Sequence, residues 1–128
     1  MHKPVILIAD DDDSLLRLFT IRCKALGLEV RTAADGMMAL TSIHKDPPDI
    51  VLLDINMPAG NGLGVLEMLK TDRRLGKISV IVYSGESSEE IINRCKSLRA
   101  HFVKKSPDAW TILKPILQQL IVARRSAA

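Results

Sequence analysis

Four apolar stretches of the chain each run directly into residues that can take part in chemistry. The stretches are Val5 to Ala9, Ile50 to Leu53, Ile78 to Tyr83, and Phe102 with Val103. The residues that follow them are Asp10, Asp11, Asp54, Ser84, Lys104 and Lys105. Short runs rich in Val, Ile and Leu, separated by longer helical patterns, are typical of strands in a parallel sheet that is buried on both faces. Because the carboxyl ends of parallel strands lie along one edge of the sheet, we expect these polar side chains to meet in one crevice.

The charges at this crevice predict a bound divalent cation. Asp10, Asp11 and Asp54 carry three negative charges and the Lys105 ammonium restores one, which leaves a net charge of minus two. Neighbouring carboxylates repel each other unless a cation offsets them. A small set of hard oxygen ligands that leaves room for water and a phosphoryl oxygen favours Mg²⁺ over a dedicated Ca²⁺ cage.

The same residues are suited to phosphoryl transfer. A carboxylate beside Mg²⁺ can act as a nucleophile towards phosphorus and form an acyl phosphate. The transfer needs in-line positioning and neutralisation of the equatorial oxygens, which Mg²⁺ and Lys105 would supply, and the Ser84 hydroxyl would donate a further hydrogen bond. Each residue alone has an ordinary explanation, such as a turn serine or a solvated lysine at a strand end. Their combination indicates a site.

The elements that would hold this crevice alternate strictly between strand and helix. Strands are predicted at residues 5–9, 28–33, 49–53, 78–83 and 101–104. Helices are predicted at about 14–26, 36–45 and 63–73, from the capping box Ser87 to Glu90 through Leu98, and from Pro107 to about Ala123. Asp12 or Asp13 is expected to cap the first helix. Strict alternation implies right-handed crossovers and an α/β fold with a doubly wound, five-stranded parallel sheet and five helices.

The composition is that of one globular domain. The chain has 128 residues, of which 47% are hydrophobic and 26% charged, enough for a sizeable core. No apolar run approaches the roughly 20 residues that span a bilayer and the amino terminus lacks a signal-peptide layout, so a cytoplasmic protein without membrane insertion is predicted. The net charge of +3 comes from scattered Lys and Arg, which argues against direct nucleic acid binding. Cys23 and Cys95 lie on apolar helix faces and are expected to be buried free thiols.

Several motifs of the chain fit one known family. They are Asp10-Asp11, Asp35-Gly36, Asp54 with Ile55-Asn56-Met57-Pro58, Gly62, Ser84-Gly85 and Phe102-Val103-Lys104-Lys105. With these motifs the chain resembles the receiver domain of two-component response regulators, over essentially its full length. The resemblance implies a single receiver domain over residues 1–128 with a flavodoxin-like strand order 2-1-3-4-5. It also implies that Asp54 accepts a phosphoryl group from a histidine kinase or a phosphotransfer protein.

The resemblance assigns the remaining site residues as well. Asp10, Asp11, Asp54 and the main-chain carbonyl of Asn56 would bind Mg²⁺, while Lys105 would assist the transfer. The chain would then be a phospho-acceptor that catalyses its own phosphorylation and dephosphorylation, and not an enzyme that acts on other substrates.

A switch is implied by the same family pattern. Ser84 would assist the transfer, and its hydroxyl would move to the phosphoryl group, vacating space into which Phe102 turns. The face formed by the fourth helix, the fifth strand and the fifth helix would change, and a downstream target protein would read it.

Three departures from the family pattern lie near this switch. Family members commonly have Pro directly after the lysine, in a cis bond, whereas this chain has Ser106 and then Pro107. A cis bond before Ser costs about 2.5 to 4 kcal/mol, so we expect the loop to be rearranged. Leu98-Arg99 replaces a small Gly-Ala pair, and Phe102 lacks the hydroxyl of the commoner Tyr.

Two polar residues are expected to tune hydrolysis of the acyl phosphate. Asn56 follows the acceptor by two residues and Glu86 follows Ser84 by two, so both border the path of the hydrolytic water. The pair resembles that of chemotaxis-type single-domain regulators, which turn over quickly. A short-lived acyl phosphate is therefore predicted.

The last predicted helix has more apolar residues than one buried face needs. One stripe, expected to pack on the sheet, comprises Ile112, Ile116 and Leu120. The other, expected to reach the surface near Phe102 as a partner face, comprises Trp110, Leu113, Leu117 and Ile121. A homodimer or an acidic partner helix would dock there. The alternative is that the fourth helix covers this stripe completely.

Other functions are also compatible with parts of the sequence. A degenerate receiver would bind partners without phosphorylation. An aspartyl-phosphate hydrolase would need a second aspartate as the acid, where this chain has Asn56. A nucleotide-binding enzyme is disfavoured because Gly60, Gly62 and Gly64 do not form a fingerprint after the first strand. We expect a stand-alone receiver, although the chain could also be a fragment of a larger regulator.

Overall fold

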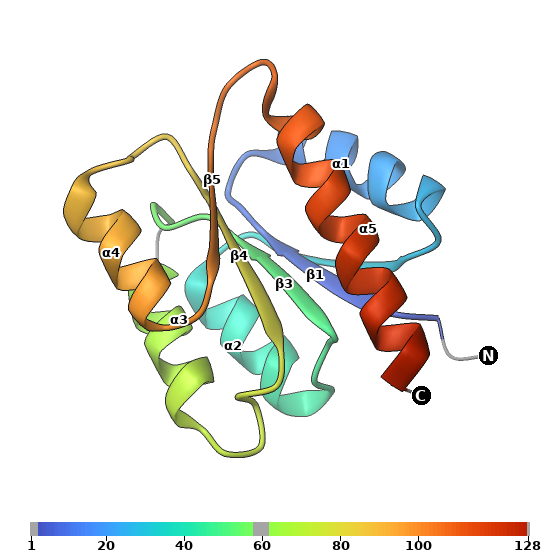
Figure 1. Cartoon of the computed structure of the whole chain (residues 1–128), viewed down its shortest axis with the longest axis horizontal. Helices are drawn as coiled ribbons and strands as arrows, with labels where there is room; N and C mark the ends of the chain where they lie inside the picture. The colour runs from blue at the N-terminus through green and yellow to red at the C-terminus, as the bar shows by residue number, and fades with distance from the viewer. Residues whose placement is uncertain (1–2, 58–61, 128) are drawn as a thin grey trace.

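The computed structural model describes residues 3–57 and 62–127 and contains a five-stranded parallel sheet between two layers of helices (Figure 1). The strands are β1 (Val5–Ala9), β2 (Glu29–Ala33), β3 (Ile50–Leu53), β4 (Ser79–Ser84) and β5 (His101–Lys104). The helices are α1 (Asp13–Ala25), α2 (Gly36–Lys45), α3 (Gly62–Thr71), α4 (Glu89–Ser97) and α5 (Ala109–Ala127). The strand order is β2-β1-β3-β4-β5 and each neighbouring pair is parallel. The predicted fold class and strand order are confirmed.

Side chains that alternate along the strands build a separate core on each face of the sheet. On β4, Val80 and Val82 join the cluster under α2, α3 and α4, whereas Ile81 and Tyr83 join the cluster under α1 and α5 (Figure 1). The central strands are buried on both faces, which explains their continuous apolar sequences. The polar residues Asp10 and Asp54 come directly after β1 and β3, at the carboxyl ends of these strands.

The capping residues of α1 and α4 belong to the residues and motifs that were predicted to cap these helices. Asp12 caps α1, since one of its carboxylate oxygens accepts hydrogen bonds from the main-chain N–H groups of Ser14 and Leu15. At α4 the capping residue is Ser88, whose hydroxyl oxygen accepts from the Ile91 N–H at 3.3 Å. The cap therefore lies one residue after the start of the predicted capping box.

The connection from β5 to α5 differs from the predicted helix start. Pro107 lies in a turn before the helix, in which the Ala109 N–H donates to the Ser106 carbonyl at 3.1 Å. All described peptide bonds are trans, including the bond between Lys105 and Ser106. The Lys105 N–H donates to the Ser84 carbonyl at 2.9 Å, so the pairing of β4 with β5 continues to the edge of the crevice.

The residues of α5 that are buried most deeply belong to the stripe that was predicted to reach the surface, although Ile116 and Leu120 of the other stripe are half-buried against the same core. Leu113 and Leu117 are fully buried, and Ile121 is buried beside them, in the cluster under α1 and α5. Ile112, which was expected to be buried, is 56% exposed. The prediction that Leu113 and Leu117 form a surface for partners is wrong. The alternative, that α4 covers them, is also wrong, because they pack on the side of the sheet away from α4.

The more deeply buried stripe of α5 starts with a small residue. The two stripes are about equally apolar, so helical spacing alone does not distinguish them. The buried stripe begins with Ala109, which is itself buried in the same cluster. Trp110 is half-buried against Phe19 of α1, with ring centroids 5.9 Å apart. Trp110 thus lies between α5 and α1, whereas Phe102 packs on the other side of the sheet.

The two cysteines, Cys23 and Cys95, are buried and free, as predicted. In the part of the chain that the structure describes, no helix is both long and apolar enough to cross a membrane.

Candidate functional site

Three carboxylates meet at the carboxyl ends of β1 and β3. Asp10 and Asp54 are buried, Asp11 is exposed, and one carboxylate oxygen from each lies within 4.8 Å of the other two. The backbone fixes the buried pair, because the Asp10 N–H donates to the Ala33 carbonyl and the Asp54 N–H donates to the Ala9 carbonyl, each at 3.0 Å. These bonds extend the strand ladders by one residue. The three aspartates are thus brought together as expected.

Lys105 reaches this cluster from the end of β5. Its Nζ lies 3.0 Å from Asp10 Oδ2 and 3.1 Å from Asp54 Oδ2. Burial disfavours the charged form of Lys105, but the hydrogen bonds and charges of Asp10 and then Asp54 outweigh it and raise the pKa of the ammonium. Lys105 therefore stays protonated and neutralises one of the three negative charges.

Burial is the main influence on the charge of Asp10. Burial raises the pKa of the Asp10 carboxyl above its usual value, even though the Asp12 N–H (2.9 Å) and Lys105 both favour the charged form. The neighbouring Asp54 raises this pKa further. The bond to Lys105 thus offsets only part of the effect of burial on this carboxyl.

The donor set fits a divalent cation that prefers oxygen ligands. Three carboxylates and one ammonium leave a net charge of minus two, and the exposed Asp11 places one ligand at the solvent side. Asn56 lies beside the site, because its N–H donates to Asp54 Oδ1 at 3.2 Å. The role of its carbonyl as a metal ligand stays a prediction.

The two expected switch residues lie on neighbouring strands, Ser84 at the end of β4 and Phe102 on β5. Ser84 is fully buried, and its hydroxyl oxygen accepts a hydrogen bond from the Glu86 N–H at 3.1 Å. Phe102 is half-buried and packs against the core cluster under α2, α3 and α4. Glu86 and Asn56 are both exposed, which leaves their side chains accessible to water.

Gly62 lies directly against the main chain of Asp54 and Ile55, a contact that was not predicted from the sequence although the residue itself was named. Its N–H donates to the Ile55 carbonyl at 2.9 Å. A Cβ at this position would lie 2.3 Å from the Asp54 carbonyl oxygen and 2.7 Å from the Ile55 Cα. The start of α3 can pack against the chain after β3 only because residue 62 has no side chain. Pro58 and Gly60 of the same loop lie outside the described residues.

Gly62→Ala is expected to destabilise the protein by about 1 to 3 kcal/mol, because the added methyl group forces the backbone next to Asp54 to move. Urea unfolding measures the change. The matched control is Gly85→Ala, since a Cβ at Gly85 would meet nothing within 4 Å. Equal stabilities for the two variants would contradict the role given to Gly62.

In the metal-free protein, Asp10→Asn is expected to increase stability at neutral pH. The folded-state pKa of Asp10 lies above the ordinary value of 3.8, so the folded chain binds a proton in a pH range where the unfolded chain does not. The charged carboxylate therefore costs stability above the raised pKa, and this cost fades as the pH falls towards 3.8. Lys105 keeps Asp54 as a partner in the variant.

Urea unfolding in a metal chelator over a pH series measures this effect. The advantage of Asp10→Asn should be largest near neutral pH and shrink in acid. Asp13→Asn, an exposed control on α1, should show no such trend. An Asp10→Asn variant that is less stable than the wild type at every pH would contradict the prediction.

One residue in contact with the site was missed by sequence reasoning. The Lys105 ammonium lies over the ring of Tyr83, 5.5 Å from its centroid. Tyr83 is the last apolar residue before Ser84, and the sequence analysis treated it only as the end of a strand. Only the sheet register, which places Tyr83 opposite Val103, brings the two side chains together.

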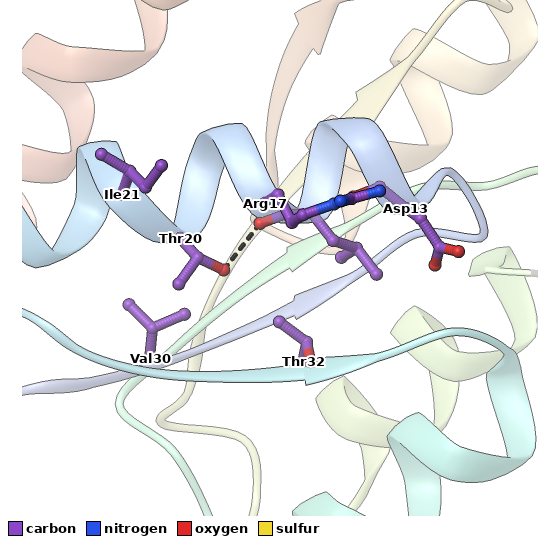
Figure 2. Close-up of a pocket in the computed structure, with 7 residues that line it drawn as sticks. Asp13, Arg17, Thr20, Ile21, Val30 and Thr32 are labelled. Atoms are coloured by element: carbon purple, nitrogen blue, oxygen red, sulfur yellow. Dashed lines mark hydrogen bonds between the residues drawn. The ribbon is translucent and has the colours of Figure 1, made fainter.

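A groove with a volume of about 630 Å³ lies between α1 and β2 (Figure 2). Its lining residues are Asp13, Leu16, Arg17, Thr20, Ile21, Val30 and Thr32. Figure 2 shows that the Thr20 hydroxyl turns back to its own helix, where it donates to the Leu16 carbonyl at 2.6 Å. The clustered aspartates and Lys105 are not in this lining. The converging charges, and not the size of a groove, therefore identify the candidate site.

Comparisons with known proteins agree with this geometry. The family model described as the response regulator receiver domain matches residues 6–118. A curated protein named probable transcriptional regulator ycf27, from Galdieria sulphuraria, is 43% identical over 71 residues. That match covers 56% of this chain and 28% of the relative, so the chain accounts for less than a third of the relative's length.

Solved structures match over almost the whole chain. The signal receiver domain of a DNA binding response regulator protein (merR) from Colwellia psychrerythraea 34H has a TM-score of 0.84 at 26% identity, covering 91% of this chain and 97% of that one. The chemotaxis protein CheY4 of Vibrio cholerae has a TM-score of 0.80 at 26% identity, covering 94% of this chain and 99% of that one.

Proposed function

Because the chain belongs to the response regulator receiver domain family, we propose that it accepts a phosphoryl group on Asp54 from a histidine kinase or a histidine phosphotransfer protein. The observation that carries this proposal is the setting of the Asp54 carboxylate. Its Oδ2 lies 3.1 Å from the Lys105 ammonium, its Oδ1 accepts the Asn56 N–H, and it shares the crevice with Asp10 and Asp11.

The transfer makes an acyl phosphate on the Asp54 side chain. A carboxylate oxygen attacks the phosphorus, the bond from phosphorus to the donor's leaving atom breaks, and the leaving group keeps the electron pair. Lys105 now pairs with Asp54 and would pair with a phosphoryl oxygen afterwards, which offsets the added negative charge. Asp10, Asp11, Asp54 and the Asn56 carbonyl would hold Mg²⁺, which when bound supplies further positive charge for the phosphoryl oxygens.

Movements of the Ser84 hydroxyl and the Phe102 ring would transmit the phosphorylation of Asp54 to the protein surface. The buried Ser84 hydroxyl has a proton to donate to a phosphoryl oxygen on Asp54, and its movement would free space for the half-buried Phe102 ring. The ring brings no hydroxyl with it, so the change rests on packing alone. The α4, β5 and α5 surface would then be read by a target protein or an output domain.

The signal of this chain would pass through protein contacts. The curated relative is named as a transcriptional regulator, and the chain covers 28% of it. The Lys and Arg residues are scattered along the sequence and do not form the clustered stripe that binding to nucleic acid needs. We therefore propose that the receiver contacts a target protein and does not contact nucleic acid directly. We propose that the chain catalyses its own phosphorylation and dephosphorylation and does not turn over another substrate. Its proposed location is the cytoplasm.

The acyl phosphate is expected to be short-lived, with Glu86→Lys slowing its hydrolysis several-fold. Glu86 and Asn56 are exposed polar groups that follow Ser84 and the acceptor by two residues each, so both would border the path of the incoming water. A lysine at position 86 would place a long cationic side chain over that path. Loss of radiolabel after removal of the donor measures the half-life.

Glu90→Lys is the matched control for this variant, because it makes the same charge reversal on the exposed first turn of α4. It should leave the half-life unchanged. A wild-type half-life of many hours in Mg²⁺, or a Glu86→Lys protein that hydrolyses at the wild-type rate, would contradict the proposed role.

The function itself is tested by incubation with acetyl phosphate. The proposal expects acid-stable, base-labile phosphate on the protein in Mg²⁺ and none in a metal chelator. A protein that binds its partners equally well with and without Asp54, and takes no label, would instead be a degenerate receiver.

A further inference from the structure

Lys105 contacts an aromatic ring as well as two carboxylates. Its ammonium lies over the Tyr83 ring at 5.5 Å from the centroid, while it bonds Asp10 at 3.0 Å and Asp54 at 3.1 Å. Tyr83 is buried, being 5% exposed. A cation within about 6 Å of an aromatic centroid is attracted to the ring face, most strongly where both are withdrawn from water.

One aromatic side chain packs directly on the Tyr83 ring, and a second aromatic side chain packs behind the first. Phe19 of α1 meets it edge to face, with centroids 5.2 Å apart at an angle of 71°. Phe19 packs in turn against Trp110 of α5, and the Arg22 guanidinium lies over the Trp110 ring at 5.2 Å. The ring is therefore a fixed surface. It cannot follow the ammonium if Lys105 moves.

A fixed ring matters because the lysine stem is flexible and the Lys105 side chain is 29% exposed. The carboxylates attract the ammonium in any rotamer that reaches them. Contact with a ring on the α1 and α5 side favours the rotamers that keep the ammonium over that ring. Burial also raises the pKa of the Tyr83 phenol, so the ring stays neutral and keeps its attraction for a cation.

We infer that Tyr83 is a positioning residue, which holds the Lys105 ammonium beside Asp54 for phosphoryl transfer. The inference rests on the proposed function and adds to it a residue that acts through Lys105 and does not need to touch the phosphoryl group. The ring face carries the effect, so phenylalanine should replace tyrosine and an aliphatic side chain should not.

The first test compares three variants in their initial rate of labelling by acetyl phosphate with Mg²⁺. Tyr83→Leu should slow labelling roughly threefold to tenfold, the range expected for loss of one partly buried cation–π contact. Tyr83→Phe should stay within about twofold of the wild type. Ile81→Val, on the same face of β4 and in the same core, controls for core destabilisation and should label at the wild-type rate.

The second test does not depend on phosphorylation. In protein with isotopically labelled lysine, the two ε-methylene protons of Lys105 should be inequivalent and shifted by the Tyr83 ring current in the NMR spectrum. They should remain inequivalent in Tyr83→Phe and approach equivalence in Tyr83→Leu, because the stem then samples more rotamers.

The outcomes separate the inference from the proposed function. Wild-type protein that takes no label would refute the proposed function, and the NMR comparison would still decide whether Tyr83 fixes Lys105. A folded Tyr83→Leu protein that labels at the wild-type rate, or that keeps inequivalent Lys105 ε protons, would overturn the inference. So would a Tyr83→Phe protein as slow as Tyr83→Leu.

Discussion

Asp54→Asn is expected to reduce labelling by acetyl phosphate to less than about one hundredth of the wild-type rate, because an amide oxygen is a poor nucleophile towards phosphorus. The substitution preserves the shape of a buried side chain and leaves Lys105 its bond to Asp10. The fold should therefore persist, as circular dichroism and a cooperative urea transition would show. Radiolabel incorporation with time, in Mg²⁺, measures the loss.

The matched control is Asp13→Asn, which makes the same chemical change in the same acidic neighbourhood. Asp13 is exposed on the first turn of α1 and does not belong to the clustered aspartates. This variant should label at the wild-type rate. Labelling of Asp54→Asn at the wild-type stoichiometry would show that another residue accepts the phosphoryl group.

Leu117→Asp is expected to unfold the protein. Leu117 is fully buried in the core under α1 and α5, where a carboxylate would find neither water nor a cation. A loss of more than about 4 kcal/mol is expected, against a total stability of about 5 to 15 kcal/mol for a typical domain. Urea unfolding and the fluorescence of Trp110 report the result.

Ile112→Asp makes the comparable change on the exposed stripe of the same helix. Ile112 is 56% exposed, so its replacement should change stability by no more than about 0.5 kcal/mol. This pair of variants tests directly which face of α5 packs on the sheet. A stable Leu117→Asp protein together with an unfolded Ile112→Asp protein would show that Ile112 faces the sheet and Leu117 faces solvent, as predicted from the sequence.

The candidate site could be predicted because its residues follow directly from the fold. Asp10 and Asp54 are the first residues after β1 and β3, and Lys105 comes directly after β5. A parallel sheet brings such positions together whatever their separation in sequence. Strand positions were predictable for a related reason, because strands buried on both faces must be continuously apolar.

The orientation of α5 could not be predicted because it depends on packing between elements. Two stripes of this helix satisfy the same helical period, and Leu113 and Ile112 are equally apolar. The choice depends on contacts with other elements, such as the packing of Trp110 on Phe19 of α1, and these contacts have no periodic signal in the sequence.

The contacts of Gly62 and Tyr83 were hidden for a similar reason. A run of glycines indicates a loop. Only the approach of α3 to the chain after β3 shows that a side chain cannot fit at position 62. Tyr83 ends an apolar run like any core residue, and its contact with Lys105 arises from two different strands. Both are contacts across the fold, which local sequence does not encode.

The chemical identification of the phosphorylated residue tests the central claim most directly. Borohydride reduces an aspartyl phosphate to homoserine, so protein treated with acetyl phosphate and Mg²⁺ can be reduced, digested and sequenced by mass spectrometry. We expect homoserine at position 54 and unmodified aspartate at positions 10 and 11, with no homoserine when Mg²⁺ is removed by a chelator. Homoserine at another aspartate, or an unmodified Asp54 in protein that carries phosphate, would contradict the assignment of Asp54 as the phospho-acceptor.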